Sequence, residues 1–120
     1  SLTVCLDNIL RHAGITRNTE YDLAQGKTAI QILEENMTGV QVLDLSGCSL
    51  DAVLYYVNQD IPVLAILEDG EAVLVTGFNE FNVVIMEPST GKLYKKGMND
   101  ATTWFAENGN HFISYMKIDN

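Results

Sequence analysis

Residues 61–78 read IPVLAILEDGEAVLVTGF, and this stretch carries the strongest structural signal in the chain. Two continuous apolar runs of strand length, 61–67 and 72–78, lie on either side of the polar tetrapeptide EDGE at 68–71. Unbroken apolar runs bounded by turn-forming residues are typical of buried strands. A short polar connection that contains glycine favours a tight turn between two strands. The stretch therefore predicts a buried β-hairpin.

Four more strands are expected around this hairpin. NVVIME at 82–87 is followed by the turn-forming sequence PSTG at 88–91 and then by KLYKKG at 92–97. VQVLDL at 40–45 has the composition and alternation of a strand, and so does HFISYMKI at 111–118. Short connections between several of these strands favour antiparallel pairing.

The first helix is expected over residues 3–14, TVCLDNILRHAG, where apolar residues recur three and four positions apart. Thr3 is its expected N-cap and Gly14 its expected stop, which places Cys5 in the first turn.

The same periodicity predicts four further helices. Ser49 and Asn99 are the expected N-caps of the last two. The four ranges are 18–26, 27–39, 48–60 and 99–109. With most helices in the first half and most strands in the second, the chain is expected to have an α+β fold, with its helices on one side of a twisted antiparallel sheet.

Length and composition favour a single globular domain over residues 1–120. The chain has 47% hydrophobic and 19% charged residues, the balance of an ordinary folded protein. It begins at Ser1 without an initiator Met, so we expect it to be a piece of a longer protein. No apolar stretch approaches the ~20 residues that a membrane-spanning helix needs.

The formal net charge of −9 disfavours nucleic acid as a partner, because phosphates would be repelled by most of the surface. Anionic membrane is disfavoured for the same reason. The one basic cluster, KLYKKG, is interpreted as a solvated edge strand.

The cysteines and histidines do not have the spacing of a metal site. Cys5 and Cys48 are far apart in sequence, and neither His12 nor His111 forms a ligand motif with them. No metal and no cofactor are expected, and the two cysteines permit a disulfide without requiring one.

Cys5 ahead of LDNILRHAG, the segment at 50–80 and NVVIMEPSTGKLY at 82–94 together resemble papain-like cysteine peptidases of the bacteriocin-processing type, which act on double-glycine leaders. In that family a proline-containing strand leads into a turn, and a Gly-His pair opens the next apolar strand. A later strand ends in Asp-Pro followed by a turn glycine. The resemblance covers nearly the whole chain and implies a papain-like fold.

Carried over residue by residue, the resemblance assigns three site residues. Cys5 matches the nucleophile, Glu71 stands in the position of the catalytic histidine, and Glu87 before Pro88 stands in the position of the aspartate. The family's oxyanion-hole glutamine lies about six residues before the cysteine and would fall upstream of Ser1. The resemblance therefore implies a degenerate peptidase-like site.

A carboxylate in place of the imidazole would oppose ionisation of the thiol. At ~4 Å and an effective dielectric of ~20, the repulsion between Glu71 and a Cys5 thiolate is about 4 kcal/mol, or roughly three pKa units. A helix N-terminus offers only ~0.3–2 kcal/mol in the other direction. An ionised Glu71 also has no proton for a leaving amine, so hydrolysis by the usual route is expected to fail.

Other interpretations of the same residues stay open. Cys5 can be a core residue of the helix, and Glu71 an exposed turn residue. Glu71 and Glu87 can share a proton if they face each other. His111 is a candidate for a relocated base.

Two functions follow from this pattern. The first is a peptidase-like domain without proteolytic activity that acts as a peptide- or protein-binding or regulatory module. The second is an active cysteine peptidase with an altered dyad that uses Cys5 as nucleophile. A purely structural domain of a larger protein is the third reading.

The expected partner is a peptide or protein segment, preferably basic, in a cleft between the Cys5 helix and the strands of Glu71 and Glu87. Other domains of the parent chain are expected partners as well. The resemblance suggests a bacterial cell-envelope or extracytoplasmic setting and leaves the cytoplasm open.

Overall fold

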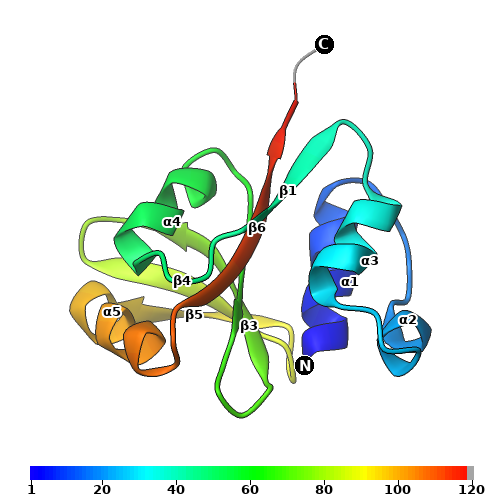
Figure 1. Cartoon of the computed structure of the whole chain (residues 1–120). Helices are drawn as coiled ribbons and strands as arrows, with labels where there is room; N and C mark the ends of the chain where they lie inside the picture. The colour runs from blue at the N-terminus through cyan, green and yellow to red at the C-terminus, as the bar shows by residue number, and fades with distance from the viewer. Residues whose placement is uncertain (119–120) are drawn as a thin grey trace.

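The computed structural model describes residues 1–118 and contains every helix and strand that the sequence predicts (Figure 1). The five helices are α1 (Leu2–His12), α2 (Glu20–Ala24), α3 (Ala29–Asn36), α4 (Leu50–Val57) and α5 (Met98–Glu107). The six strands are β1 (Val40–Asp44), β2 (Val63–Ile66), β3 (Ala72–Phe78), β4 (Asn82–Glu87), β5 (Lys92–Gly97) and β6 (His111–Lys117).

The strands form one six-stranded sheet in the order β1-β6-β2-β3-β4-β5, and every neighbouring pair is antiparallel. β2 and β3 form the predicted hairpin, whose turn is closed by a hydrogen bond from the Leu67 N–H to the Glu71 carbonyl, 2.8 Å. Gly70 in this turn has a φ of 85°, which glycine adopts without steric cost. The basic strand β5 lies at an edge of the sheet, as predicted.

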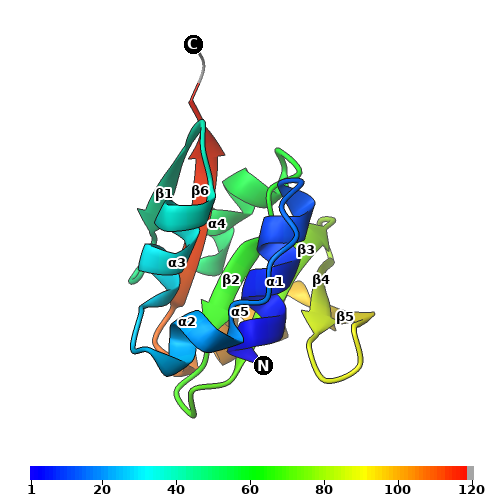
Figure 2. The same cartoon turned by 90° about the vertical axis from the view of Figure 1, so that its right-hand side faces the viewer.

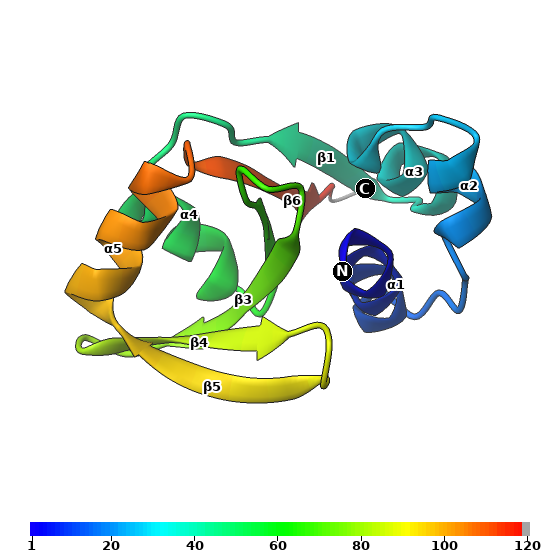
Figure 3. The same cartoon turned by 90° about the horizontal axis from the view of Figure 1, so that it is seen from below.

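Helices cover both faces of the sheet, so the expectation that they lie on one side is wrong. One core is built by α1 and α3 on the face that carries Leu64 and Leu74. The other is built by α4 and α5 on the face that carries Val63 and Val75. The sheet curls around α4 and α5, while α1, α2 and α3 lie outside the curve (Figure 3).

Two of the predicted N-caps are also wrong. α1 begins at Leu2 with Ser1 as its N-cap, so Thr3 lies inside the helix. α5 begins at Met98 directly after β5, so its N-cap is Gly97 and not Asn99. Ser49 does cap α4, because its side chain accepts a hydrogen bond from the Ala52 N–H at 3.2 Å.

No helix in residues 1–118 is both long enough and apolar enough to cross a bilayer.

Candidate functional site

Cys5 lies on the buried face of α1 and not at the surface. Its backbone N–H donates to the Ser1 carbonyl at 3.0 Å, which makes it the fourth residue of the helix. Its side chain is 0% exposed and packs in the core with Leu6, Ile9 and Ala72. Figure 2 shows α1 lying across β2 and β3, the strands that close over this face. A substrate therefore has no direct access to the sulfur.

Burial raises the pKa of the Cys5 thiol from its ordinary value of 9.0 to about 12. The charge of Glu87 adds to this rise. The pKa is raised as expected from the sequence, but the expected cause is wrong, because desolvation dominates and the contributing carboxylate is Glu87 and not Glu71. The thiol is protonated at neutral pH.

The residue that faces Glu71 at the start of α1 is Ser1. The Ser1 backbone nitrogen lies 3.9 Å from Glu71 Oε2. The Ser1 Oγ accepts a hydrogen bond from the Ala72 N–H at 2.8 Å. Ser1 is thus hydrogen-bonded to Ala72, the first residue of β3, and lies close to Glu71.

The sequence did not predict a contact between Ser1 and Glu71, but its helical spacing did predict that Cys5 is buried. Cys5 is four residues before Ile9, and both therefore lie on the same face of the helix. A residue on the apolar stripe is expected in the core.

Glu71 is held at the end of the β2–β3 turn and points toward solvent. Its backbone N–H donates to Asp69 Oδ1 at 2.9 Å, and its side chain is 62% exposed. Water therefore screens its charge, which weakens its effect on groups other than its direct neighbours.

Glu87 lies at the end of β4, opposite Lys92 on β5. Its Oε1 accepts two hydrogen bonds from Ser89, one from the backbone N–H at 3.2 Å and one from the hydroxyl at 3.1 Å. Burial raises the pKa of Tyr94, and the charge of Glu87 contributes to that rise. The charge of Glu87 thus helps to raise the pKa of both Cys5 and Tyr94.

The two carboxylates do not pair with each other among the described residues, so the arrangement that would let them share a proton is not present. Glu71 contacts Ser1, and Glu87 contacts Ser89.

Neither histidine supplies an imidazole to this end of the helix. His12 is the last residue of α1, and its Nε2 lies 2.7 Å from the Asp60 carbonyl oxygen. His111 begins β6, and its Nε2 lies 3.6 Å from Glu68 Oε1. In the part of the chain that the structure describes, no three His, Cys, Asp or Glu residues gather as metal ligands do.

One apolar side chain on α1 and one on β5 are exposed. Leu93 is 61% exposed and lies opposite Met86, which packs in the same core as Cys5. Leu93 is therefore on the α1 side of the sheet. Val4, on the first turn of α1, is 38% exposed. We refer to Val4 on α1, Glu71 before β3, Glu87 at the end of β4 and Leu93 on β5 together as the α1–β5 seam.

A solved structure has the same fold. A crystal structure from Bacillus anthracis, provisionally named a C39-like peptidase, matches with a TM-score of 0.66 and 18% sequence identity. The match covers 77% of this chain and 58% of that chain, so this chain spans little more than half of the protein that it matches. No protein-family model matches the chain, and no curated protein matches it by sequence.

The likeness confirms the predicted α+β papain-like fold. At this level of identity it does not assign the site, so the roles of Cys5, Glu71 and Glu87 stay predictions.

Proposed function

We propose that this chain is a peptidase-like domain that binds a peptide or protein segment without cleaving it. The arrangement of residues at the start of α1 carries the proposal. The thiol of Cys5 is enclosed in the core, and the residue that faces Glu71 is a serine.

The groups around α1 do not make an activated nucleophile. A cysteine nucleophile reacts as the thiolate, and burial holds Cys5 in its protonated form. A serine hydroxyl needs an adjacent base to become nucleophilic. The Ser1 hydroxyl accepts a hydrogen bond from the Ala72 backbone N–H, and within residues 1–118 no hydrogen bond joins that hydroxyl to Glu71.

The α1–β5 seam supports the binding role. Val4 and Leu93 offer apolar contact, and Glu71 and Glu87 add negative charge to a surface that belongs to a chain of net charge −9. Such a surface favours an extended segment that carries apolar and basic side chains. The same charges disfavour an acidic segment, and salt is expected to weaken binding. The seam replaces the deep cleft expected from the sequence, because core side chains fill the space between α1 and β3.

The test is an array of peptides that vary in charge and apolar content, probed with the protein at low and high salt. Bound peptides are then incubated with the protein and examined by mass spectrometry. We expect basic, apolar peptides to be retained at low salt and recovered intact. Cleaved products would contradict the loss of proteolytic activity. Peptide retention that is independent of peptide charge or salt concentration would contradict the preference for basic segments.

The matched variants are Glu71→Gln with Glu87→Gln, and Glu107→Gln on the exposed end of α5 as control. The double variant is expected to lose the preference for basic peptides by about tenfold, because two charges leave the seam. Glu107→Gln removes a carboxylate charge outside the seam and is expected to leave the preference for basic peptides unchanged.

A further inference from the structure

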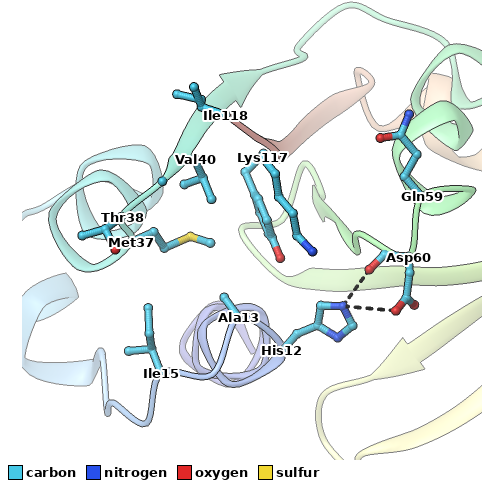
Figure 4. A pocket seen from close by; sticks show the side chains of 12 residues that line it. His12, Ala13, Ile15, Met37, Thr38, Val40, Gln59, Asp60, Lys117 and Ile118 are labelled. Atoms are coloured by element: carbon cyan, nitrogen blue, oxygen red, sulfur yellow. Dashed lines mark hydrogen bonds and ion pairs between the residues drawn. The ribbon is translucent and has the colours of Figure 1, made fainter. Parts of the chain in front are cut away.

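A cavity lies at the other end of α1, away from the seam. Its volume is about 610 Å³. It opens where three helices end, since His12 closes α1, Met37 follows α3, and Gln59 follows α4. Lys117, at the end of β6, completes the wall (Figure 4).

Asp60 holds a backbone conformation that a non-glycine residue rarely adopts. Its φ is 62°, in the left-handed region, where aspartate is tolerated better than most residues. Its N–H donates to the Val57 carbonyl and its own carbonyl accepts from His12 Nε2, at 3.0 and 2.7 Å. The carboxylate itself is left exposed at the cavity, 3.9 Å from the same imidazole nitrogen.

Tyr115 also lines the cavity and is 2% exposed. Among residues 1–118 its hydroxyl has no hydrogen-bond partner, unlike the neighbouring Ser114 hydroxyl, which donates to the Pro62 carbonyl at 2.9 Å. Burial and the charge of Asp60 raise the pKa of Tyr115, so the phenol stays protonated. Tyr115 thus contributes a polar hydroxyl to the lining of the cavity.

The electrostatics of the cavity favour a positive charge. The C-terminal end of a helix carries about half a negative charge, and the ends of α1, α3 and α4 meet here. The Asp60 carboxylate adds to this potential, and the whole chain has a net charge of −9. Lys117 contributes a positive charge of its own, because its ammonium extends into the cavity (Figure 4).

Lys117 shows what kind of group the cavity accommodates. Its ammonium forms no ion pair within the described residues, although it points toward the side of the cavity that holds Asp60 and His12 (Figure 4). The apolar side chains of Ile15, Met37 and Val40 line the remaining wall. The cavity thus offers a polar side to a charged group and an apolar wall to an aliphatic chain.

We propose that this cavity binds an alkylammonium or guanidinium group on an aliphatic stem, either as a free amine or as a Lys or Arg side chain of a peptide. The stem lies against Ile15, Met37 and Val40. The cation lies between the Asp60 carboxylate and the Tyr115 hydroxyl oxygen, and the Lys117 ammonium moves aside as a competitor.

The first test titrates isotope-labelled protein with n-butylammonium and, separately, with butyrate, which has the same length and opposite charge. Amide shifts at Ala13, Gly39 and Lys117, which line the cavity, are expected with n-butylammonium and not with butyrate. Acetyl-Gly-Lys-Gly-amide is then compared with n-butylammonium. Tighter binding of the peptide identifies a peptide source, and equal or weaker binding a free amine.

Three variants separate the proposal from an anion site. Lys117→Met is expected to tighten n-butylammonium binding by about three- to tenfold, because a competing charge is removed. Asp60→Asn keeps a residue that tolerates positive φ and is expected to weaken binding by about the same factor. Tyr115→Phe is expected to weaken it by about two- to fivefold.

Glu107→Gln serves as the distant control and is expected to change nothing. Two results overturn the proposal: amides around the cavity that respond to neither ion, or binding of butyrate that Lys117→Met abolishes.

Discussion

The two ends of α1 present opposite situations. At its start the helix buries Cys5 and holds Ser1 beside Glu71, so the position expected to carry chemistry is closed by packing. At its end the helix opens onto a cavity where the Tyr115 hydroxyl has no partner among the described residues. The comparison teaches that a shared fold conserves the path of the backbone, while each site depends on which side chain reaches the surface.

The largest expected effect is on the reactivity of Cys5. At pH 8 a thiol with the ordinary pKa of 9.0 is roughly a tenth ionised, whereas a thiol with a pKa of about 12 is ionised to roughly one part in ten thousand. Alkylation of Cys5 by iodoacetamide is therefore expected to be at least ~1,000-fold slower than that of an accessible thiol. Peptide mapping after a timed reaction measures this, with the half-exposed Cys48 as internal reference.

Denaturant provides the control for this measurement, because both cysteines should then react at similar rates. Selective labelling of Cys5 over Cys48 in the native protein would contradict the buried, protonated thiol and would revive the peptidase reading.

The second prediction rebuilds the chemistry at the start of α1. The double substitution Ser1→Cys with Glu71→His places a thiol at the helix N-terminus beside an imidazole. The helix N-terminus and the imidazole both favour the thiolate. Alkylation at position 1 near pH 6.5 is therefore expected to be about 10–100-fold faster than for an ordinary thiol.

The single substitution Ser1→Cys isolates the contribution of position 71. With Glu71 retained, the new thiol should react no faster than an ordinary one, because the carboxylate opposes ionisation. Equal rates in the single and double variants would mean that position 71 does not face position 1.

Much of the fold follows from the sequence for identifiable reasons. The β2–β3 hairpin is predicted by two apolar runs and a glycine turn, and α4 by a serine cap ahead of an apolar stripe. The placement of helices on both faces was missed, although the signal was present. A strand apolar at every position, such as 61–67, is buried on both faces and needs a cover on each.

The site was less predictable, because it depends on small shifts along the chain. Cys5 was predicted to lie at the start of the helix, but the helix begins at Leu2, and this shift places the sulfur in the core. The cavity at the other end of α1 gathers residues from α1, β6 and two connections. No sequence motif links segments so far apart.

The third prediction concerns stability in alkali. The folded Cys5 has a pKa of about 12 and the unfolded thiol a value near 9.0, so above pH 9 the unfolded state loses a proton that the folded state keeps. The free energy of unfolding should therefore fall with rising pH, with a limiting slope of about 1.4 kcal/mol per pH unit from this thiol. Urea denaturation at several pH values between 9 and 10 measures it.

Cys5→Ala is the matched variant, since it removes the titrating group and leaves a small apolar side chain. It is expected to start less stable and to have a shallower slope over the same pH range. An identical slope in both proteins would show that another group is responsible.

The smallest expected effect compares two neighbouring hydroxyls on β6. Tyr115→Phe removes a hydroxyl without a partner among the described residues, so the free energy of unfolding should change by less than ~0.5 kcal/mol or rise slightly. Ser114→Ala removes the hydroxyl that donates to Pro62 and should cost about 1 kcal/mol. Urea denaturation at neutral pH without added amine measures both. A loss in Tyr115→Phe as large as that in Ser114→Ala would mean that the phenol already has a partner in the free protein, and the cavity would then lack the unpaired hydroxyl on which cation binding there depends.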